Sequence, residues 1–252
     1  MADAKISALT NNTDPAYGDM LPLVNVDGAD ATQRTSLGLL QNWIAVDDAW
    51  AYASATTITV PSGAAAIYSV GDKVKLTQPS GTKYFYIVGV ADTVLTVTGG
   101  SDYTVANQGI TFNMFSKTSS PVGFPQYFAY TPTGVSASGV TLSGRFSIFG
   151  RTCKVNLLAT FTGAITFTTM PTLPVAASAS HLFAQSTNSP SGVAGYSDTG
   201  TATVNGTIYP SVIASATTVA LKVSATGADI SASSPITWAN TDRLSCTFDY
   251  EI

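Results

Sequence analysis

Apolar and polar residues alternate strictly along several stretches of this chain, and this alternation limits what the chain can fold into. The clearest run carries apolar side chains at every second position: Cys153, Val155, Leu157, Ala159 and Phe161. A period of two places these side chains on one face of a β-strand and the intervening polar residues on the other face. Antiparallel sheets with one buried face have this pattern, so we predict an all-β protein.

The composition replaces charge with hydroxyl groups. Charged residues make up only 10% of the 252 residues, against about a quarter in an average soluble domain. Serine supplies 27 residues and threonine 36, which together are a quarter of the chain. Hydrophobic residues make up 45%, which excludes a disordered chain. The net charge of −4 argues against a nucleic-acid-binding protein.

The sequence predicts neither a signal peptide nor a membrane anchor. Residues 1–10 lack the basic-then-apolar pattern of a signal peptide, and no apolar run approaches the roughly 18 residues of a transmembrane helix. The two cysteines, Cys153 and Cys246, are too few for a disulfide-built secreted scaffold. We expect both to be buried free thiols in a protein that folds in a reducing cytoplasm, and one bridge across a sandwich stays open as the alternative.

Residues 1–46 are predicted to form a small N-terminal attachment segment. This part is the acidic one, with five aspartates against one lysine and one arginine. Residues 20–26 favour a short extended run, and Thr35 or Ser36 can cap a short helix whose apolar positions are three and four residues apart. The segment is too small to bury a core alone, so we expect it to dock on a partner. The apolar residues expected to make this attachment are Leu21, Leu23, Leu37, Leu40 and Ile44.

Residues 47–124 are predicted to form a small β-barrel module. They contain five short strand-like runs separated by glycine and aspartate turns every eight to twelve residues. In one run Val74 and Leu76 point to one face, whereas Lys73 and Lys75 point to the other. Residues 116–128, rich in serine, proline and glycine, have the composition of a linker between domains.

Residues 125–252 are predicted to form a C-terminal antiparallel β-sandwich, jelly-roll-like, of six to eight strands. Asn205 and Gly206 are a strong signal for a tight hairpin turn. The net charge of this part is zero, so it has little long-range electrostatic attraction and must recognise a partner through close contact.

No catalytic constellation stands out, and we expect neither an enzyme nor a cofactor. The one histidine, His181, has no nucleophile elbow nearby, and one histidine with two distant cysteines cannot build a zinc site. Single aspartates such as Asp72, Asp92 and Asp242 are typical turn residues. A glycosidase with two facing carboxylates is the alternative that the sequence leaves open.

The ligand-binding candidates lie in a hydroxyl-rich stretch over residues 184–206 and just after it. Tyr196 and Asp198 fall inside this stretch, and Tyr209 follows it. A tyrosine flanked by short polar side chains suits shallow recognition of a saccharide or a protein, because it offers flat apolar area and a hydroxyl group. The alternative is an ordinary loop with a half-buried tyrosine.

Several stretches resemble the virion proteins of tailed bacteriophages. The opening 5–9 (KISAL), followed by 21–26, Thr35 and 37–44, resembles the start of many tail-fibre and receptor-binding proteins. The middle part resembles a β module of phage structural proteins that commonly ends in a Pro-x-Gly-x-Pro linker, here 121–125. The stretches that are similar to this module are 50–60, 68–78, 83–85, 95–97 and 102–107. Residues 130–133, 150–151 and 170–177 are similar to C-terminal fibre heads.

The resemblance implies an exterior virion protein of the tail-fibre or receptor-binding type, on the tail or the capsid surface. Its N-terminus would attach to other virion proteins, and its C-terminal domain would contact a host-surface glycan or protein. The resemblance also implies a homotrimer. A capsid decoration or head-fibre protein is the main alternative, and a glycan depolymerase is a weaker one.

Overall fold

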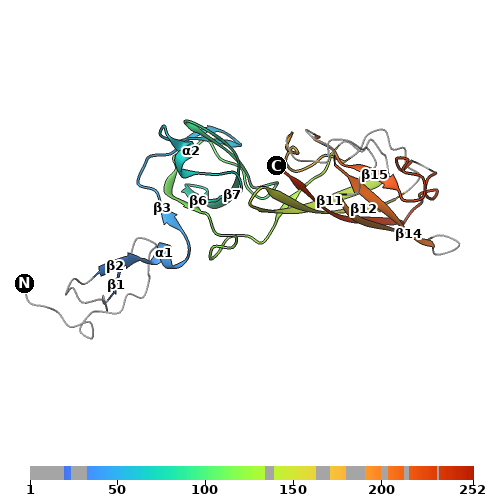
Figure 1. Ribbon diagram of the computed structural model, residues 1–252, viewed down its shortest axis with the longest axis horizontal. Coiled ribbons are helices and arrows are strands. Elements are labelled where there is room, and N and C mark those ends of the chain that lie inside the picture. Colours follow the sequence, from blue (N-terminus) through green and yellow to red (C-terminus); the bar gives the residue numbers. More distant parts are fainter. Residues whose placement is uncertain are drawn as a thin grey trace, which may run out of the picture.

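Strands dominate the computed structural model. The structure describes residues 20–23, 33–133, 139–162, 171–179, 191–199, 204–212, 216–231 and 233–252. Among these residues strands far outnumber helices, which are limited to two four-residue segments, so the prediction of an all-β protein is confirmed. Three parts follow one another in a row, namely an N-terminal hairpin, a middle sheet and a C-terminal sheet (Figure 1).

The N-terminal part is a two-stranded hairpin with one turn of helix. Strands β1 (Met20–Leu23) and β2 (Gln33–Ser36) pair antiparallel, and α1 (Leu37–Leu40) follows at once. The predicted helix is therefore much shorter than its apolar spacing suggested. Asn42 adopts a left-handed conformation (φ 64°) two residues after the helix, and Ile44 already belongs to a strand. Trp43, between them, is fully buried, so burial of this side chain overrides the helical pattern.

The middle sheet has seven strands in the order β3-β9-β6-β7-β8-β5-β4. The prediction of a closed barrel is not confirmed, because no described pairing joins the end strands β3 and β4. A short helix, α2 (Ala64–Ile67), precedes β6. The strands are β3 (Ile44–Ala45), β4 (Ala51–Ser54), β5 (Thr57–Thr59), β6 (Lys73–Gln78), β7 (Gly81–Ala91), β8 (Val94–Thr98) and β9 (Thr111–Ser116).

Both faces of this middle sheet are covered. Val74 and Leu76 face one core, as predicted. Lys73 and Lys75 do point to the opposite face, but only 2% and 6% of their surface is exposed. That face carries Tyr84 and Tyr86 on the neighbouring strand, in register with the two lysines. Aromatic side chains from outside the sheet lie against this face: Trp43, Phe124 and Phe128.

The C-terminal sheet also has seven antiparallel strands, in the order β10-β11-β12-β16-β13-β14-β15. Its order is consistent with the predicted sandwich. The core lies on one face, where Phe146, Val155 and Phe248 are almost completely buried. The strands are β10 (Phe128–Tyr130), β11 (Val140–Phe149), β12 (Thr152–Phe161), β13 (Gly192–Asp198), β14 (Val204–Ser211), β15 (Ala220–Val223) and β16 (Arg243–Glu251).

The predicted turn at Asn205 and Gly206 is wrong, because both residues lie inside β14 and pair with β13. The ring of Tyr196 lies over Gly206, where an added Cβ would be only 2.3 Å from the tyrosine oxygen. Glycine is therefore required here for close packing between strands and not for a turn.

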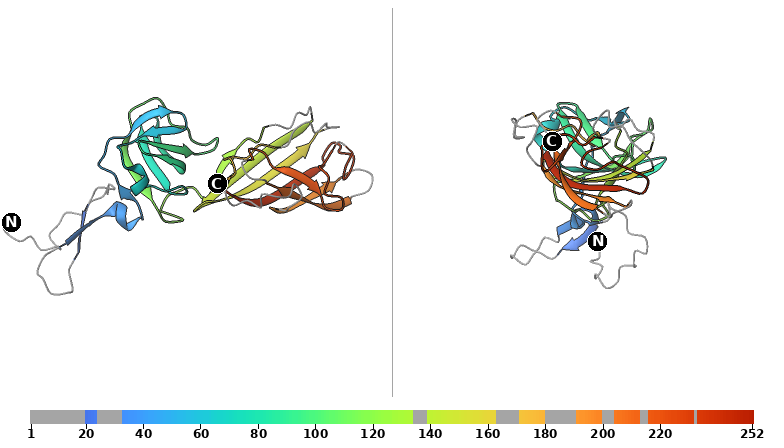
Figure 2. Two further views of the ribbon diagram at one scale, coloured as in Figure 1. Left: turned by 45° about the horizontal axis from the view of Figure 1, so that its top comes forward. Right: turned by 90° about the vertical axis from the view of Figure 1, so that its right-hand side faces the viewer.

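Phe124 and Phe128, from the residues predicted to be a linker, are buried between the two sheets, whereas residues 117–120 and 126–127 of the same stretch are exposed. Phe124 contacts Trp43, Tyr86 and Phe128, and all four belong to the buried core of the C-terminal sheet. Two hydrogen bonds also cross the junction, since Ser101 N donates to Ala129 O at 2.8 Å and Ala129 N donates to Asp102 Oδ2 at 2.9 Å. Figure 2 shows the two sheets held end to end by this junction.

Candidate ligand-binding surface

The face of the C-terminal sheet opposite its core is here called the outer face. Alternation along β11, β12 and β16 sends every second side chain to it. Cross-strand register assembles these side chains into rows, of which the central one contains Arg145, Asn156 and Thr247. The neighbouring rows hold Ser147, Lys154 and Asp249 on one side and Ser143, Leu158 and Ser245 on the other.

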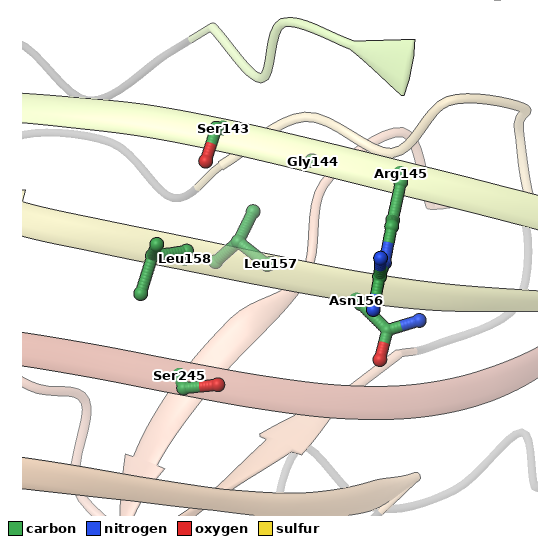
Figure 3. A pocket seen from close by; sticks show the side chains of 7 residues that line it. All are labelled: Ser143, Gly144, Arg145, Asn156, Leu157, Leu158 and Ser245. Carbon is green, nitrogen blue, oxygen red and sulfur yellow. The ribbon is translucent and has the colours of Figure 1, made fainter. Parts of the chain in front are cut away.

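Two hollows on the outer face share Arg145 and Asn156, and together they are here called the trough. The first has a volume of about 370 Å³ and is also lined by Ser143, Leu158 and Ser245 (Figure 3). The second has a volume of about 440 Å³ and is also lined by six further residues: Gln126, Tyr127, Phe146, Ser147, Phe149 and Lys154. Both hollows are shallow and open to solvent, so a ligand here would be bound on the sheet surface and not enclosed.

Contacts within the trough fix the two shared side chains. The guanidinium carbon of Arg145 lies 4.8 Å from the ring centre of Tyr127, which is a cation–π contact. Figure 3 shows Arg145 extending from β11 toward Asn156 on β12. The Thr247 hydroxyl donates a hydrogen bond of 2.9 Å to Asn156 Oδ1. The amide nitrogen of Asn156 is therefore left to donate toward the trough.

The trough is locally cationic in an acidic chain. Among the described residues, Arg145 has no carboxylate within ion-pairing distance. Lys154 faces Asp249 across the register, with no ion pair formed between them. The trough thus offers two cations and an amide donor.

The structure separates the three predicted ligand residues. Tyr196 and Asp198 lie on the core face of β13, and Tyr196 packs edge-on against the buried Trp238 at 5.9 Å. Tyr209 lies on the opposite face of β14, next in sequence to the core residue Ile208. The three side chains therefore do not form one site, and the half-buried Tyr196 fits the alternative of a packing residue.

The predicted attachment residues lie on three elements. Leu21 and Leu23 belong to β1, and Leu37 and Leu40 belong to α1. Ile44 belongs to β3, which pairs with β9 of the middle sheet. Leu40 and Ile44 expose 57% and 42% of their surface, which is unusual for large apolar side chains. Their exposure keeps them available for a partner.

The described acidic side chains at turns have structural partners. Asp92 accepts a hydrogen bond from Gly63 N at 2.8 Å. The fully buried Asp242 accepts hydrogen bonds from Thr199 N and Ala239 N. Such carboxylates organise loops. The described residues contain no group of three metal-binding side chains, and His181 lies outside them.

The two cysteines are free, which resolves the alternative of a bridge. Cys153 pairs with Tyr250 and Cys246 with Leu157, so the thiols lie four residues apart along the β12–β16 register. Burial raises the pKa of both thiols to about 12. Both therefore stay protonated at neutral pH, where a thiol is a poor nucleophile.

Sequence analysis missed Arg145, Lys154, Asn156 and Tyr127. The signal that could have found them is the same alternation that defined the strands, because Arg145 precedes the core residue Phe146 and Asn156 lies between Val155 and Leu157. Neither of the two helices among the described residues is long and apolar enough to cross a membrane. No protein-family model matches the chain, and no curated protein or solved structure is significantly similar to it.

Proposed function

We propose that this chain is an exterior virion protein of a tailed bacteriophage, of the tail-fibre or receptor-binding type. Residues 1–46 attach it to the particle, and the C-terminal sheet contacts the host surface. The proposal starts from the resemblance of the N-terminal and middle stretches to such proteins. The observation that carries it is the arrangement of the described parts, with exposed apolar residues toward one end and an open polar sheet face toward the other (Figure 1).

The junction between the two sheets supports a role in which position matters. A shared aromatic core and two hydrogen bonds, one between backbone groups and one from a backbone amide to the Asp102 carboxylate, hold the sheets together, whereas a flexible linker would let them move independently. The junction therefore holds the C-terminal sheet at a fixed distance from the middle sheet, to which β3 of residues 1–46 is paired. This suits a protein that reaches from a particle to a surface.

The proposed activity is binding and not catalysis. The described turn aspartates are engaged by backbone amides, and both thiols are buried. Incubation of the purified chain with host envelope polysaccharide is expected to release no reducing ends. Release that is lost on substituting a trough residue would instead support the depolymerase alternative.

Imaging of particles tests the proposal directly. Particles of the phage whose genome encodes this chain are labelled with antibody against residues 125–252 and viewed by electron microscopy. We expect label at the tail, in a small number of copies. Label spread over the capsid in hundreds of copies would replace the tail assignment by capsid decoration, and particles without label would overturn both.

A truncation tests the attachment end, and the structure sets where to cut. Removing residues 1–36 leaves Trp43 and β3 in place, whereas removing residues 1–46 takes away a buried tryptophan and a paired strand. We expect the shorter truncation to unfold at the same temperature as the full chain but to be absent from particles. Incorporation at the normal level would show that residues 1–36 do not make the attachment, and would leave only Leu37, Leu40 and Ile44 of the predicted residues.

The homotrimer implied by the resemblance stays a prediction. Several copies on one particle would add weak contacts into strong attachment. Sedimentation equilibrium of the full chain measures the mass directly, and a monomer at micromolar concentration would contradict the prediction.

A further inference from the structure

We infer that the trough on the outer face binds an anionic saccharide, with Arg145 holding its carboxylate or phosphate group. The inference rests on the proposed function and names the class of ligand that the C-terminal sheet contacts. It is carried by hydrogen-bond donors and unpaired charge gathered in one hollow.

The donors of the trough match an oxygen-rich anion. The central carbon of the Arg145 guanidinium lies 4.8 Å from the ring centre of Tyr127, and the group forms no ion pair with a described carboxylate. A planar guanidinium binds a carboxylate or phosphate through two parallel hydrogen bonds. The Asn156 amide, oriented by Thr247, adds a donor in the same row. Lys154 adds a second cation in the neighbouring row.

Charge complementarity sets the sign of the ligand. The chain has a net charge of −4, yet the trough contains Arg145 and Lys154. The nearby Glu251 is already paired with Arg151 at 3.1 Å, which leaves Asp249 as the carboxylate facing this region. A neutral ligand would leave the charge of Arg145 without a counter-charge.

The shape and lining of the trough favour a saccharide over a protein. Phe149 and Leu158 expose 52% and 42% of their surface, but two polar rows separate them, so they form no continuous apolar patch. A stable protein interface needs an apolar core of several contacting side chains. The hydroxyl of Ser147, in the same hollow as the exposed rings of Tyr127 and Phe149, instead suits a sugar, which has polar edges and apolar faces.

Titration calorimetry with the full chain tests the inference. The probes are polysialic acid, which carries carboxylates, a glycerol-phosphate polymer, which carries phosphates, and dextran, which is neutral. We expect binding to one or both anionic polymers and none to dextran. The polymer that binds identifies the source of the anion. Binding to none of the three, or to dextran as tightly as to the anionic polymers, would overturn the inference.

Two arginine variants locate the binding. Arg145→Gln is expected to weaken binding at least about tenfold, because it removes a charge-assisted pair of hydrogen bonds. Arg243→Gln is the matched control. Arg243, on β16, is also exposed on the outer face of the C-terminal sheet but does not line the trough. We expect the control to change affinity less than about threefold. Equal loss in both variants would reduce the effect to non-specific attraction and contradict a site at Arg145.

Cell labelling separates failure of the inference from failure of the proposed function. The fluorescent full chain is expected to label host cells, and Arg145→Gln is expected to lose this labelling at an unchanged unfolding temperature. Undiminished labelling by the variant would overturn the anionic ligand while the receptor-binding role stands. A chain that neither joins particles nor labels host cells would overturn the proposed function itself.

Discussion

The middle and C-terminal sheets each have seven antiparallel strands, but they differ in the face opposite the main core, which is covered in the middle sheet and exposed in the C-terminal sheet. In the middle sheet, Trp43, Phe124 and Phe128 cover the second face and bury even two lysines. In the C-terminal sheet, the second face keeps Arg145, Lys154 and Leu158 open to solvent. The covered face joins the two sheets, and the open face is the one for which we propose a ligand.

This difference shows that a polar pattern on a strand does not decide whether its face is solvated. Lys73 and Lys75 alternate with apolar residues just as Lys154 does. The deciding factor is which other segment packs on that face, and here the segment is residues 117–128. The stem of a lysine tolerates such burial when its amine finds an acceptor, as the Lys73 amine does at Gly71 O, 3.0 Å away.

The largest expected effect comes from removing an aromatic side chain at the junction. Phe128→Ala deletes a fully buried ring and is expected to lower the free energy of unfolding by about 3–5 kcal/mol. Phe149→Ala, on the open face, is the matched control and is expected to cost within about 0.5 kcal/mol. Denaturant unfolding of both variants measures the difference. Similar losses would show that the open face is covered after all.

A pair of glycine variants tests how closely the two sheets meet. Gly71 (φ 93°) lies against the C-terminal sheet, and a Cβ there would be 1.9 Å from Gly150 O. Gly63 (φ 88°) has a similar conformation with open space around it. Both alanine variants carry the left-handed strain, about 1–2 kcal/mol, and Gly71→Ala should lose about 1–3 kcal/mol more through overpacking. Equal unfolding midpoints for the two variants would show that the backbone around Gly150 shifts at little cost to make room for the added methyl group.

The smallest effect concerns the covered lysine and its pH dependence. Burial lowers the pKa of Lys73, with a smaller opposing effect from Asp72. The unfolded chain therefore binds more protons between the lowered pKa and the ordinary value of 10.5, and stability from this group rises with pH across that window. Lys73→Met has no titrating amine and lacks this rise. At pH 7 its free energy of unfolding should therefore exceed that of the wild type by up to about 1 kcal/mol.

The difference in unfolding free energy between wild type and Lys73→Met isolates this group, because the other titrating residues are common to both. We expect the gap to shrink as the pH approaches 10.5. Lys154→Met, at an exposed position, is the control and should show no such trend. A gap that stays constant with pH would show that the amine is well solvated.

Local patterns were sufficient where one strand and its flanking turns decide the structure. Val74 and Leu76 face a core from β6, and the alternation from Cys153 to Phe161 lies within β12, as predicted. In both cases the buried face follows from a period of two. The core of the C-terminal sheet could therefore be predicted from the sequence.

Local patterns failed where distant segments meet. The spacing of Leu37, Leu40 and Ile44 predicts a helix that reaches Ile44, but the burial of Trp43 against Tyr84 and Phe124 ends the helix at Leu40. The candidate site was also missed for this reason, since its central row draws one residue from each of three strands. Tyr196 was selected for its polar neighbours in sequence, whereas its neighbour in space is Trp238.

The position of β16 has a consequence for biosynthesis. This strand lies between β12 and β13 and is the element that joins β10-β11-β12 to β13-β14-β15. A nascent chain must therefore be translated through Glu251 before the two halves can unite, and until then each half exposes an unpaired strand edge. A ribosome that stops early would therefore release a chain prone to aggregation.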